Sequence, residues 1–204
     1  MDKSGLSERK KAFENRTKLY LNAGFDRFSA ARIVAGSAGP IAGPALDVGT
    51  GKGVLAMAIA SLGIDVVSVD IDEDEQVLAE LLACEAGVSE RIRFIRCDAS
   101  SLPFPDNHFG YVAMMDVLHH LAKPAPVLKE MLRVVKPGGI IILADFSRSG
   151  FELVARIHSE EGRTHPESGA TLSAARTTLE TEGMSLLREV EGHHHEIIVL
   201  KKKL

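Results

Sequence analysis

The sequence predicts an α/β fold in which a parallel sheet is followed by an antiparallel hairpin. Short apolar segments rich in β-branched residues alternate with helical segments along most of the chain, as in parallel strands joined by right-handed crossovers. A glycine-rich turn stands between the first strand and the next helix, with Gly49, Gly51 and Gly53 at every second position. Near the carboxyl end, two strand patterns are separated only by the turn Glu191-Gly192-His193, which indicates a hairpin.

The strands are predicted where apolar runs lack a polar face. Asp65-Val66-Val67-Ser68-Val69-Asp70 is such a run, and it indicates a strand that is buried on both sides, as in parallel sheets. The predicted strands are 45–48, 65–70, 92–97, 111–115 and 140–144, followed by 184–190 and 196–200 in the hairpin.

Helix boundaries are predicted from capping residues and from glycine. Asp72 with Glu75 fits a capping box that opens a helix over 73–86, and Gly87 ends it. Lys136-Pro137-Gly138-Gly139 is expected to end a helix and to start the next strand. The helices predicted within the sheet region are 54–62, 73–86, 125–135 and 172–182.

Two helices are expected before the sheet, over 7–22 and 26–35, and a Gly/Pro/Ala linker over 36–44 follows them. Ser7 is the predicted N-cap of the first helix. Its apolar residues Phe13, Leu19 and Leu21 are predicted to face inward.

Length and composition predict one domain over 1–204. The 204 residues are 45% hydrophobic and 25% charged, as in ordinary globular proteins. A formal net charge of −4 gives no electrostatic basis for binding nucleic acid or an anionic membrane. No apolar run is long enough to span a bilayer, and Met1-Asp2-Lys3-Ser4 leads into a polar helix, so we expect a cytoplasmic protein. Cys84 and Cys97 fall in patterns of a buried helix and a buried strand and are predicted to be inert core thiols.

The segment Asp47-Val48-Gly49-Thr50-Gly51-Lys52-Gly53 predicts a nucleotide-type ligand site. Glycine lets a ligand approach the main chain closely, and the start of the next helix adds unpaired amide groups. Dinucleotide folds use G-x-G-x-x-G, but here Val54 stands where that pattern has its third glycine. The segment instead resembles motif I of the class I S-adenosylmethionine-dependent methyltransferases, an acidic residue followed by x and G-x-G-x-G.

Two further segments carry the same resemblance. Leu102-Pro103-Phe104-Pro105-Asp106-Asn107-His108-Phe109 resembles the L-P-F-P-D-x-x-F-D segment of the small-molecule, quinone-biosynthesis-like branch ("methyltransferase domain 11"), although Gly110 replaces the final Asp. Asp116-Val117-Leu118-His119-His120-Leu121 resembles the motif IV of the family. The resemblance covers roughly 44–202. It implies a Rossmann-like, seven-stranded methyltransferase sheet with helices on both faces, an N-terminal helical lid over 1–43 and a catalytic core over 44–204.

The resemblance also implies the cofactor S-adenosylmethionine and a position for each of its parts. Asp70, which ends the second strand, can accept both ribose hydroxyls, and Ile71 can pack on the adenine. Asp98 is expected at the adenine amino group and the amide of Ala99 at the ring. The competing interpretations are a helix cap for Asp70 and a turn for Asp98. The expected cofactor-binding residues are Asp47, Gly49, Thr50, Gly51, Gly53, Asp70, Ile71, Asp98, Ala99 and Asp116.

The segment after the fourth strand holds the candidate catalytic residues. In the resembled family this segment borders the transferred methyl group. Asp116 and either His119 or His120 are therefore the candidates to orient or deprotonate an acceptor. The alternative for each histidine is a packing or helix-start role.

Seven histidines are predicted to gather at one edge of the sheet, because the loop after the fifth strand and the hairpin turn both lie there. A three-histidine metal site or a histidine base would then be available. Scattered histidines in a solvated loop are the competing interpretation, and no metal ligand is assigned. These residues are His119, His120, His158, His165, His193, His194 and His195.

The predicted function is transfer of a methyl group from S-adenosylmethionine to a small-molecule acceptor. The acceptor pocket is expected from 6–39 and 147–170, because the leading helices lie over the cofactor in the resembled family; packing on the sheet edge is the alternative. A non-catalytic adenosyl-ligand-binding subunit and a histidine- or metal-assisted methyltransferase are the other hypotheses. The expected assembly is a monomer or homodimer, with no nucleic-acid or membrane partner.

Overall fold

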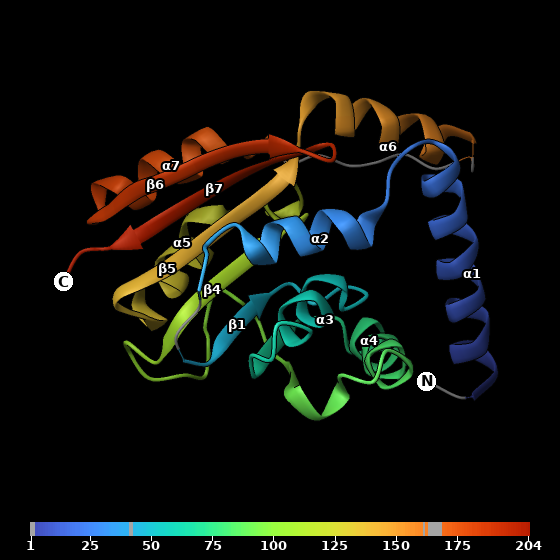
Figure 1. Ribbon diagram of the computed structural model, residues 1–204, viewed down its shortest axis with the longest axis horizontal. Coiled ribbons are helices and arrows are strands. Elements are labelled where there is room, and N and C mark those ends of the chain that lie inside the picture. The colour runs from blue at the N-terminus through green and yellow to red at the C-terminus, as the bar shows by residue number, and fades with distance from the viewer. Residues whose placement is uncertain (1–2, 41–42, 161, 163–168) are drawn as a thin grey trace.

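The computed structural model describes residues 3–40, 43–160, 162 and 169–204. Its centre is a seven-stranded sheet with the strand order β3-β2-β1-β4-β5-β7-β6 (Figure 1). Five strands are parallel, and β7 pairs antiparallel with both β5 and β6. The strands are β1 (Ala45–Val48), β2 (Val66–Asp70), β3 (Ile92–Arg96), β4 (Phe109–Met115), β5 (Val135–Phe146), β6 (Met184–Gly192) and β7 (His195–Lys202). The predicted fold class is confirmed.

Helices cover both faces of this sheet. Residues of α2 (Arg27–Gly36), α3 (Val54–Ala60) and α4 (Glu73–Glu85) share one apolar core, and residues of α5 (Pro124–Val134) and α7 (Leu172–Thr181) share the other. Neighbouring residues of a strand point to opposite faces, so Ala45 packs in the first core and Leu46 in the second. Alternating crossovers of this kind leave the carboxyl ends of the parallel strands at one common edge.

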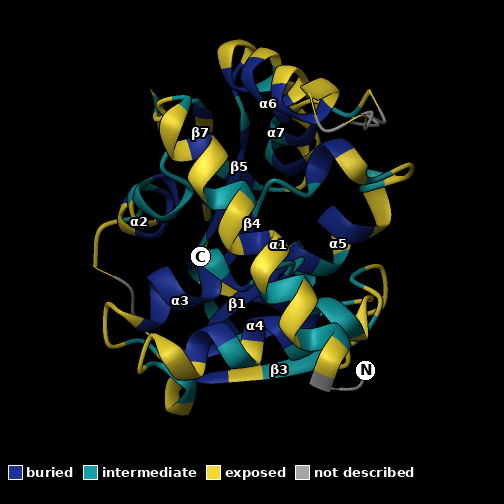
Figure 2. Ribbon diagram, turned by 90° about the vertical axis from the view of Figure 1, so that its right-hand side faces the viewer, coloured by how far each residue is buried: buried dark blue, intermediate teal, exposed yellow. Residues whose placement is uncertain are grey.

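α1 (Lys3–Asn22) and α6 (Arg148–Glu160) stand at that edge. Figure 2 looks onto it, with α1 crossing in front of the strands. The amino-terminal half of α1 is tied to α4 by an ion pair between Arg9 and Asp74 (3.1 Å), and its last turn places Tyr20 in a small core with Val154 of α6. The short helices η1 (Ser89–Arg91) and η2 (Leu118–His120) complete the described elements.

The predictions for the first helix were partly wrong. The described helix spans Lys3–Asn22, so Ser7 lies inside it and is not an N-cap. Phe13 does face inward, but Leu19 and Leu21 are 43% and 49% exposed. Because α1 spans the edge of the sheet and does not pack along a face, it contacts the body through only part of its surface.

Two turns also differ from the prediction. Lys136-Pro137-Gly138-Gly139 does not precede the fifth strand but lies inside β5, where the register with β4 shifts between Phe109 and Tyr111. The hairpin turn is formed by His193 and His194, which have φ values of 49° and 64° and follow the expected glycine.

The cysteine prediction was wrong about burial. Cys84 is exposed on α4 and Cys97 is half-buried after β3, and both are free thiols. Apolar neighbours in the sequence suggested a buried position for Cys84, but the outer face of α4 carries it. Among the described helices, none is both long enough and apolar enough to cross a membrane.

Candidate functional site

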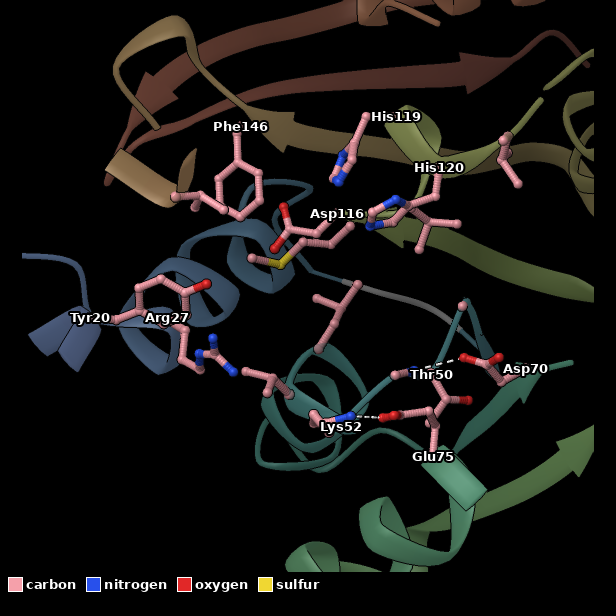
Figure 3. Close-up of a pocket in the computed structure, with 18 of the residues that line it drawn as sticks. Tyr20, Arg27, Thr50, Lys52, Asp70, Glu75, Asp116, His119, His120 and Phe146 are labelled. Atoms are coloured by element: carbon pink, nitrogen blue, oxygen red, sulfur yellow. Dashed lines mark hydrogen bonds and ion pairs between the residues drawn. The ribbon is translucent and has the colours of Figure 1, made fainter. Parts of the chain in front are cut away.

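A cavity of about 640 Å³ lies at the carboxyl edge of the parallel strands. It sits over β1 and β4, where the strand order reverses direction, and open α/β sheets bind ligands at such a point. One side, which we call the glycine-loop side, is formed by 49–52, Asp70, Ile71 and Glu75. The opposite side, the histidine side, comes from α1, α2, α6 and the ends of β4 and β5 (Figure 3). Its residues include Tyr20, Phe25, Arg27, Met115, Asp116, His119, His120, Phe146, Val154 and His158.

The three glycines of the loop have different reasons to be glycine. All three have positive φ values, 85° at Gly49, 48° at Gly51 and 73° at Gly53. A Cβ atom at Gly49 would come within 2.3 Å of the side chain of Val117, and one at Gly53 would lie 3.0 Å from Ala79. A Cβ atom at Gly51 would meet nothing within 4 Å, because this glycine faces the open cavity. Gly53 is not in the cavity wall; it starts α3.

Asp70 fixes the glycine loop. Its Oδ2 accepts a hydrogen bond from the Gly51 amide (2.8 Å), and its Oδ1 accepts one from the Asp72 amide (2.9 Å). Each carboxylate oxygen can accept a second bond, so Asp70 remains able to receive hydroxyl groups from the cavity. The cap of α4 is Asp72, which accepts from the amides of Asp74 and Glu75.

Asp47 lies beneath the loop and not in the cavity wall. It is 1% exposed, and the Ser68 hydroxyl donates to its Oδ2 at 2.7 Å. A further hydrogen bond joins Ser68 to Thr50 (2.7 Å), which itself lines the cavity. Burial, opposed by the hydrogen bond from Ser68 and aided by the charge of Asp70, raises the pKa of Asp47 to about 7. In this structure Asp47 supports the loop from behind and does not face the cavity.

Of the three residues expected at the adenine, the structure places Ile71 in the cavity wall and the other two outside it. Ile71 is 66% exposed and lines the cavity. Asp98 is exposed, and its Oδ1 accepts from the Ser100 amide at 2.8 Å, so its hydrogen bonds with Ser100 hold its pKa below the usual value. Neither Asp98 nor Ala99 belongs to the cavity wall. The turn interpretation of Asp98 fits this geometry.

Lys52 links the glycine loop to the first helix through Glu75. Lys52 forms an ion pair with Glu75 (Figure 3). Glu75 also lies 3.5 Å from Arg9 of α1. Burial, together with nearby arginine charges, lowers the pKa of Lys52 to about 8. The Glu75 side chain is thus engaged by Lys52 and Arg9. Of the predicted capping box, only the N-cap interaction of Asp72 is formed.

On the histidine side, the buried His195 forms an ion pair with the half-buried Asp116. Asp116 follows β4 with a left-handed φ of 59°, and its Oδ1 lies 2.8 Å from Nε2 of His195. Nδ1 of His195 lies 2.9 Å from the His193 carbonyl oxygen. Because both partners are acceptors, both ring nitrogens must donate, so the ring is an imidazolium facing a carboxylate. Burial opposes this charge, but Asp116, the His193 carbonyl and Asp145 outweigh it and raise the pKa of His195.

His119 is held by Asp145. The imidazole Nδ1 lies 2.5 Å from Oδ1 of Asp145, and the His119 amide donates to Oδ2 of the same carboxylate at 3.1 Å. Both residues are almost fully buried, and His119 lines the cavity. With its Nδ1 proton directed at Asp145, a neutral His119 carries its lone pair on Nε2. His120 also lines the cavity, with its ring 4.0 Å from that of His119, but it is exposed.

The remaining histidines do not all gather at this cavity. His158 lines it and lies 3.3 Å from the Tyr20 hydroxyl, whereas His193 and His194 border a separate hollow at the hairpin turn. His165 lies outside the described residues. Within the described part of the chain, no group of three or more histidine, cysteine, aspartate or glutamate side chains is arranged to hold a metal ion.

Sequence reasoning missed part of the histidine side. Asp145 and His195 were not connected to His119 and Asp116, and Tyr20, Phe25 and Arg27 were included only as part of a broad range. A strand that ends in Asp145 beside Phe146 gave a local signal, since polar residues at strand ends often reach a site. The aromatic residues of the first two helices gave none.

Solved structures establish the class of this fold. The crystal structure of an S-adenosylmethionine-dependent methyltransferase from Aquifex aeolicus matches with a TM-score of 0.67 and 20% sequence identity. The match covers 95% of this chain and 97% of that one. The fold is that of the S-adenosylmethionine-dependent methyltransferases.

Sequence comparison adds the family. Residues 46–143 match the family described as a methyltransferase domain. The chain is 35% identical over 146 residues to demethylmenaquinone methyltransferase of Clavibacter sepedonicus, a match that covers 70% of this chain and 57% of that protein. It is 34% identical over 116 residues to ubiquinone/menaquinone biosynthesis C-methyltransferase UbiE of Ectopseudomonas mendocina (strain ymp), covering 55% and 45%. The matched segments thus span about half the length of these relatives.

Residues 46–143 of this chain match a methyltransferase domain, on a fold that S-adenosylmethionine-dependent methyltransferases share. The class and the cofactor expected from the glycine motif are confirmed.

Proposed function

We propose that this protein methylates a hydroxylated aromatic ring of the quinol type, with His119 as the proton acceptor. The observation that carries the proposal is the pair formed by His119 and Asp145 in the wall of the cavity, 2.5 Å apart. The two relatives, a ubiquinone/menaquinone biosynthesis C-methyltransferase and a demethylmenaquinone methyltransferase, support the same acceptor class.

The residues present fit the cofactor of the family. Gly51 leaves the loop open toward the cavity, Asp70 has free acceptor capacity beside it, and Ile71 offers an exposed apolar surface. We assign Gly49, Thr50 and Gly51 to the methionine end, Asp70 to the ribose and Ile71 to the adenine. When bound, S-adenosylmethionine supplies a methyl group that is already activated by a sulfonium.

The chain's own task is then to orient the acceptor, exclude water and take a proton. Phe25, Met115 and Phe146 offer apolar and aromatic surface on the histidine side, which suits a planar ring. Removing a phenolic proton raises the nucleophilicity of the adjacent ring carbon, and we assign Nε2 of His119, the ring nitrogen that Asp145 does not hold, to accept that proton. Asp145 acts through His119 as a positioning residue, and Asp116, which lines the cavity and is held by His195, is assigned to orient the acceptor. We also propose that α1 and α2 serve as the cover of this cavity.

The test measures methyl transfer from labelled S-adenosylmethionine to demethylmenaquinone reduced to its quinol. His119→Gln should lower kcat by about 100-fold or more, with the affinity for S-adenosylhomocysteine changed less than about twofold. Asp145→Asn should lower kcat by about tenfold and shift the pH–rate profile, because the ring loses its orienting carboxylate. His108→Gln, at an exposed histidine outside the cavity wall, is the control.

Two results contradict the proposal. A wild-type protein that binds S-adenosylhomocysteine but methylates no quinol would favour another acceptor or a non-catalytic adenosyl-binding role. A His119→Gln variant with wild-type kcat would remove His119 as the proton acceptor.

A further inference from the structure

Arg27 brings a positive charge into the cavity wall without an acidic partner. It is the first residue of α2, and its side chain reaches the cavity beside Tyr20 (Figure 3). Its guanidinium carbon lies 4.6 Å from the centre of the Tyr20 ring and 5.3 Å from that of Phe13. Aromatic faces attract a cation but do not neutralise it. No carboxylate of residues 3–40, 43–160, 162 or 169–204 forms an ion pair with Arg27.

The carboxylates near Arg27 are engaged elsewhere. Asp26, the preceding residue, caps α2 by accepting from the Phe28 amide (3.0 Å) and from the Ser29 hydroxyl (2.5 Å). Asp116 is close enough to favour the charge of Arg27, but its Oδ1 is held by His195 at 2.8 Å. Glu75 is paired with Lys52. Among the described residues, none of these carboxylates forms an ion pair with Arg27.

Burial makes the missing partner significant. The Nε atom of Arg27 is buried and has no hydrogen-bond partner. Burial lowers the pKa of Arg27, but a guanidinium stays protonated in proteins, so the charge remains. A buried donor without an acceptor is unfavourable, and an arriving acceptor relieves this.

Among the described residues, the cavity wall also holds Lys52 and the three carboxylates Asp70, Glu75 and Asp116. Lys52 forms an ion pair with Glu75, so its charge is already balanced. Arg27 is therefore the group on this wall that is free to attract an anionic part of a ligand.

We propose that Arg27 is a carboxylate-binding site of the cavity. The planar fork of a guanidinium matches a carboxylate with two parallel hydrogen bonds. The carboxylate has two sources: the amino-acid end of the cofactor, in which case the proposal rests on the function proposed above, or an acid group on the acceptor. The experiment separates the two sources.

The first arm compares two adenosyl ligands by calorimetry. S-adenosylhomocysteine carries the amino-acid end, whereas 5′-methylthioadenosine lacks it. If the cofactor is the source, Arg27→Gln lowers the affinity for S-adenosylhomocysteine by about tenfold or more and changes the affinity for 5′-methylthioadenosine by less than about twofold. Arg93→Gln, at an exposed arginine of β3 outside the cavity wall, is the matched control and leaves both unchanged.

The second arm tests an acid on the acceptor side. Benzoate and its uncharged counterpart benzamide are titrated at millimolar concentration into the protein, with and without S-adenosylhomocysteine. If the acceptor is the source, benzoate binds the wild type and loses about tenfold in affinity in Arg27→Gln, while benzamide does not distinguish the two proteins. Arg27→Lys keeps the charge without the fork, so an intermediate loss is expected in whichever arm responds; it also carries the test if Arg27→Gln does not fold.

Two outcomes overturn the proposal. In one, Arg27 substitutions lower the affinities for S-adenosylhomocysteine and 5′-methylthioadenosine equally, as expected if Arg27 has a purely structural role. In the other, the variants bind S-adenosylhomocysteine and benzoate as the wild type does, or benzoate binds neither protein while S-adenosylhomocysteine is unaffected. Failure of the wild type to bind either adenosyl ligand counts against the proposed function instead, and the benzoate arm on the unliganded protein still decides the role of Arg27.

Discussion

The glycine-loop side and the histidine side of the cavity are built from different lengths of chain. On the glycine-loop side, the bond from Gly51 to Asp70 joins residues 19 positions apart, and that from Ser68 to Asp47 joins residues 21 apart. On the histidine side, Tyr20 meets His158 across 138 positions, and His195 meets Asp116 across 79. One side is thus a property of a single strand–turn–helix–strand unit, whereas the other exists only once the whole sheet has formed. Substitutions on the two sides should therefore have different effects on stability and on ligand binding.

The largest effect is expected in the backbone of the glycine loop. Gly49→Ala places a Cβ atom 2.3 Å from the Val117 side chain at a φ of +85°, so the free energy of unfolding should fall by about 3 kcal/mol. Gly51→Ala meets open space and should lose only about 1 kcal/mol, from its left-handed backbone. Urea denaturation measures both values. Adding Val117→Ala should restore part of the loss in Gly49→Ala; equal losses in the two single variants would contradict the packing argument.

Asp47 should give the next largest effect, and it should depend on pH. Its pKa is raised to about 7 by burial, so between pH 4 and 7 the folded chain holds a proton that the unfolded chain has released. Its contribution to stability therefore falls as the pH rises through that range. Asn does not titrate, so Asp47→Asn should gain about 2 kcal/mol relative to the wild type between pH 5 and pH 8, measured by urea denaturation. The exposed Asp65→Asn is the control, and an Asp47→Asn difference that does not vary with pH would refute the buried proton.

Asp70 and Asp98 test which of two aspartates near the glycine-loop side contributes to ligand binding. Asp70→Ala removes the acceptor of the Gly51 amide at the cavity, so affinity for S-adenosylhomocysteine should fall by at least about tenfold, as measured by calorimetry. Asp98→Ala changes an exposed turn outside the cavity wall and should alter that affinity less than about twofold. A tenfold loss in Asp98→Ala instead would restore its expected role at the adenine.

The smallest effect is expected at the ion pair of the histidine side. The pKa of His195 is raised above its ordinary value of 6.5, so its contribution is complete below that pH and is lost as the pH rises through the folded-state pKa. His195→Gln should therefore be destabilised relative to the wild type by about 1 kcal/mol more at pH 6 than at pH 9. Thermal unfolding at the two pH values, with His108→Gln as the control, measures the difference. The reverse pH dependence would show that the ring is neutral at pH 6.

The features that depend on short stretches of chain are also those that the sequence could predict. The bounds of β1 and the capping of α4 by Asp72 were predicted correctly because hydrophobic runs, glycine and capping residues act over a few positions. The parallel sheet with its terminal hairpin followed from the order of such local patterns. Asp70 and Ile71 were placed at the ligand edge by the same reasoning, since each follows directly from the end of a strand.

The remaining features depend on contacts that no local pattern encodes. The partner of His119 is Asp145, 26 residues away on the next strand, and only the register of β4 and β5 brings them together. Asp70 is the last residue of β2, whereas Asp98 lies two residues beyond the end of β3, where its side chain accepts from the Ser100 amide in a turn. The prediction for Leu19 was wrong because an apolar residue in a helix does not by itself show which face of the helix packs against the rest of the protein.

Glu75 has a consequence beyond its place in the cavity wall. It joins Lys52 of the glycine loop to Arg9 of the helix that crosses the edge of the sheet. Partly exposed ion pairs weaken as dissolved ions shield them. The attachment of this helix to the glycine loop should therefore loosen as the ionic strength of the solution rises.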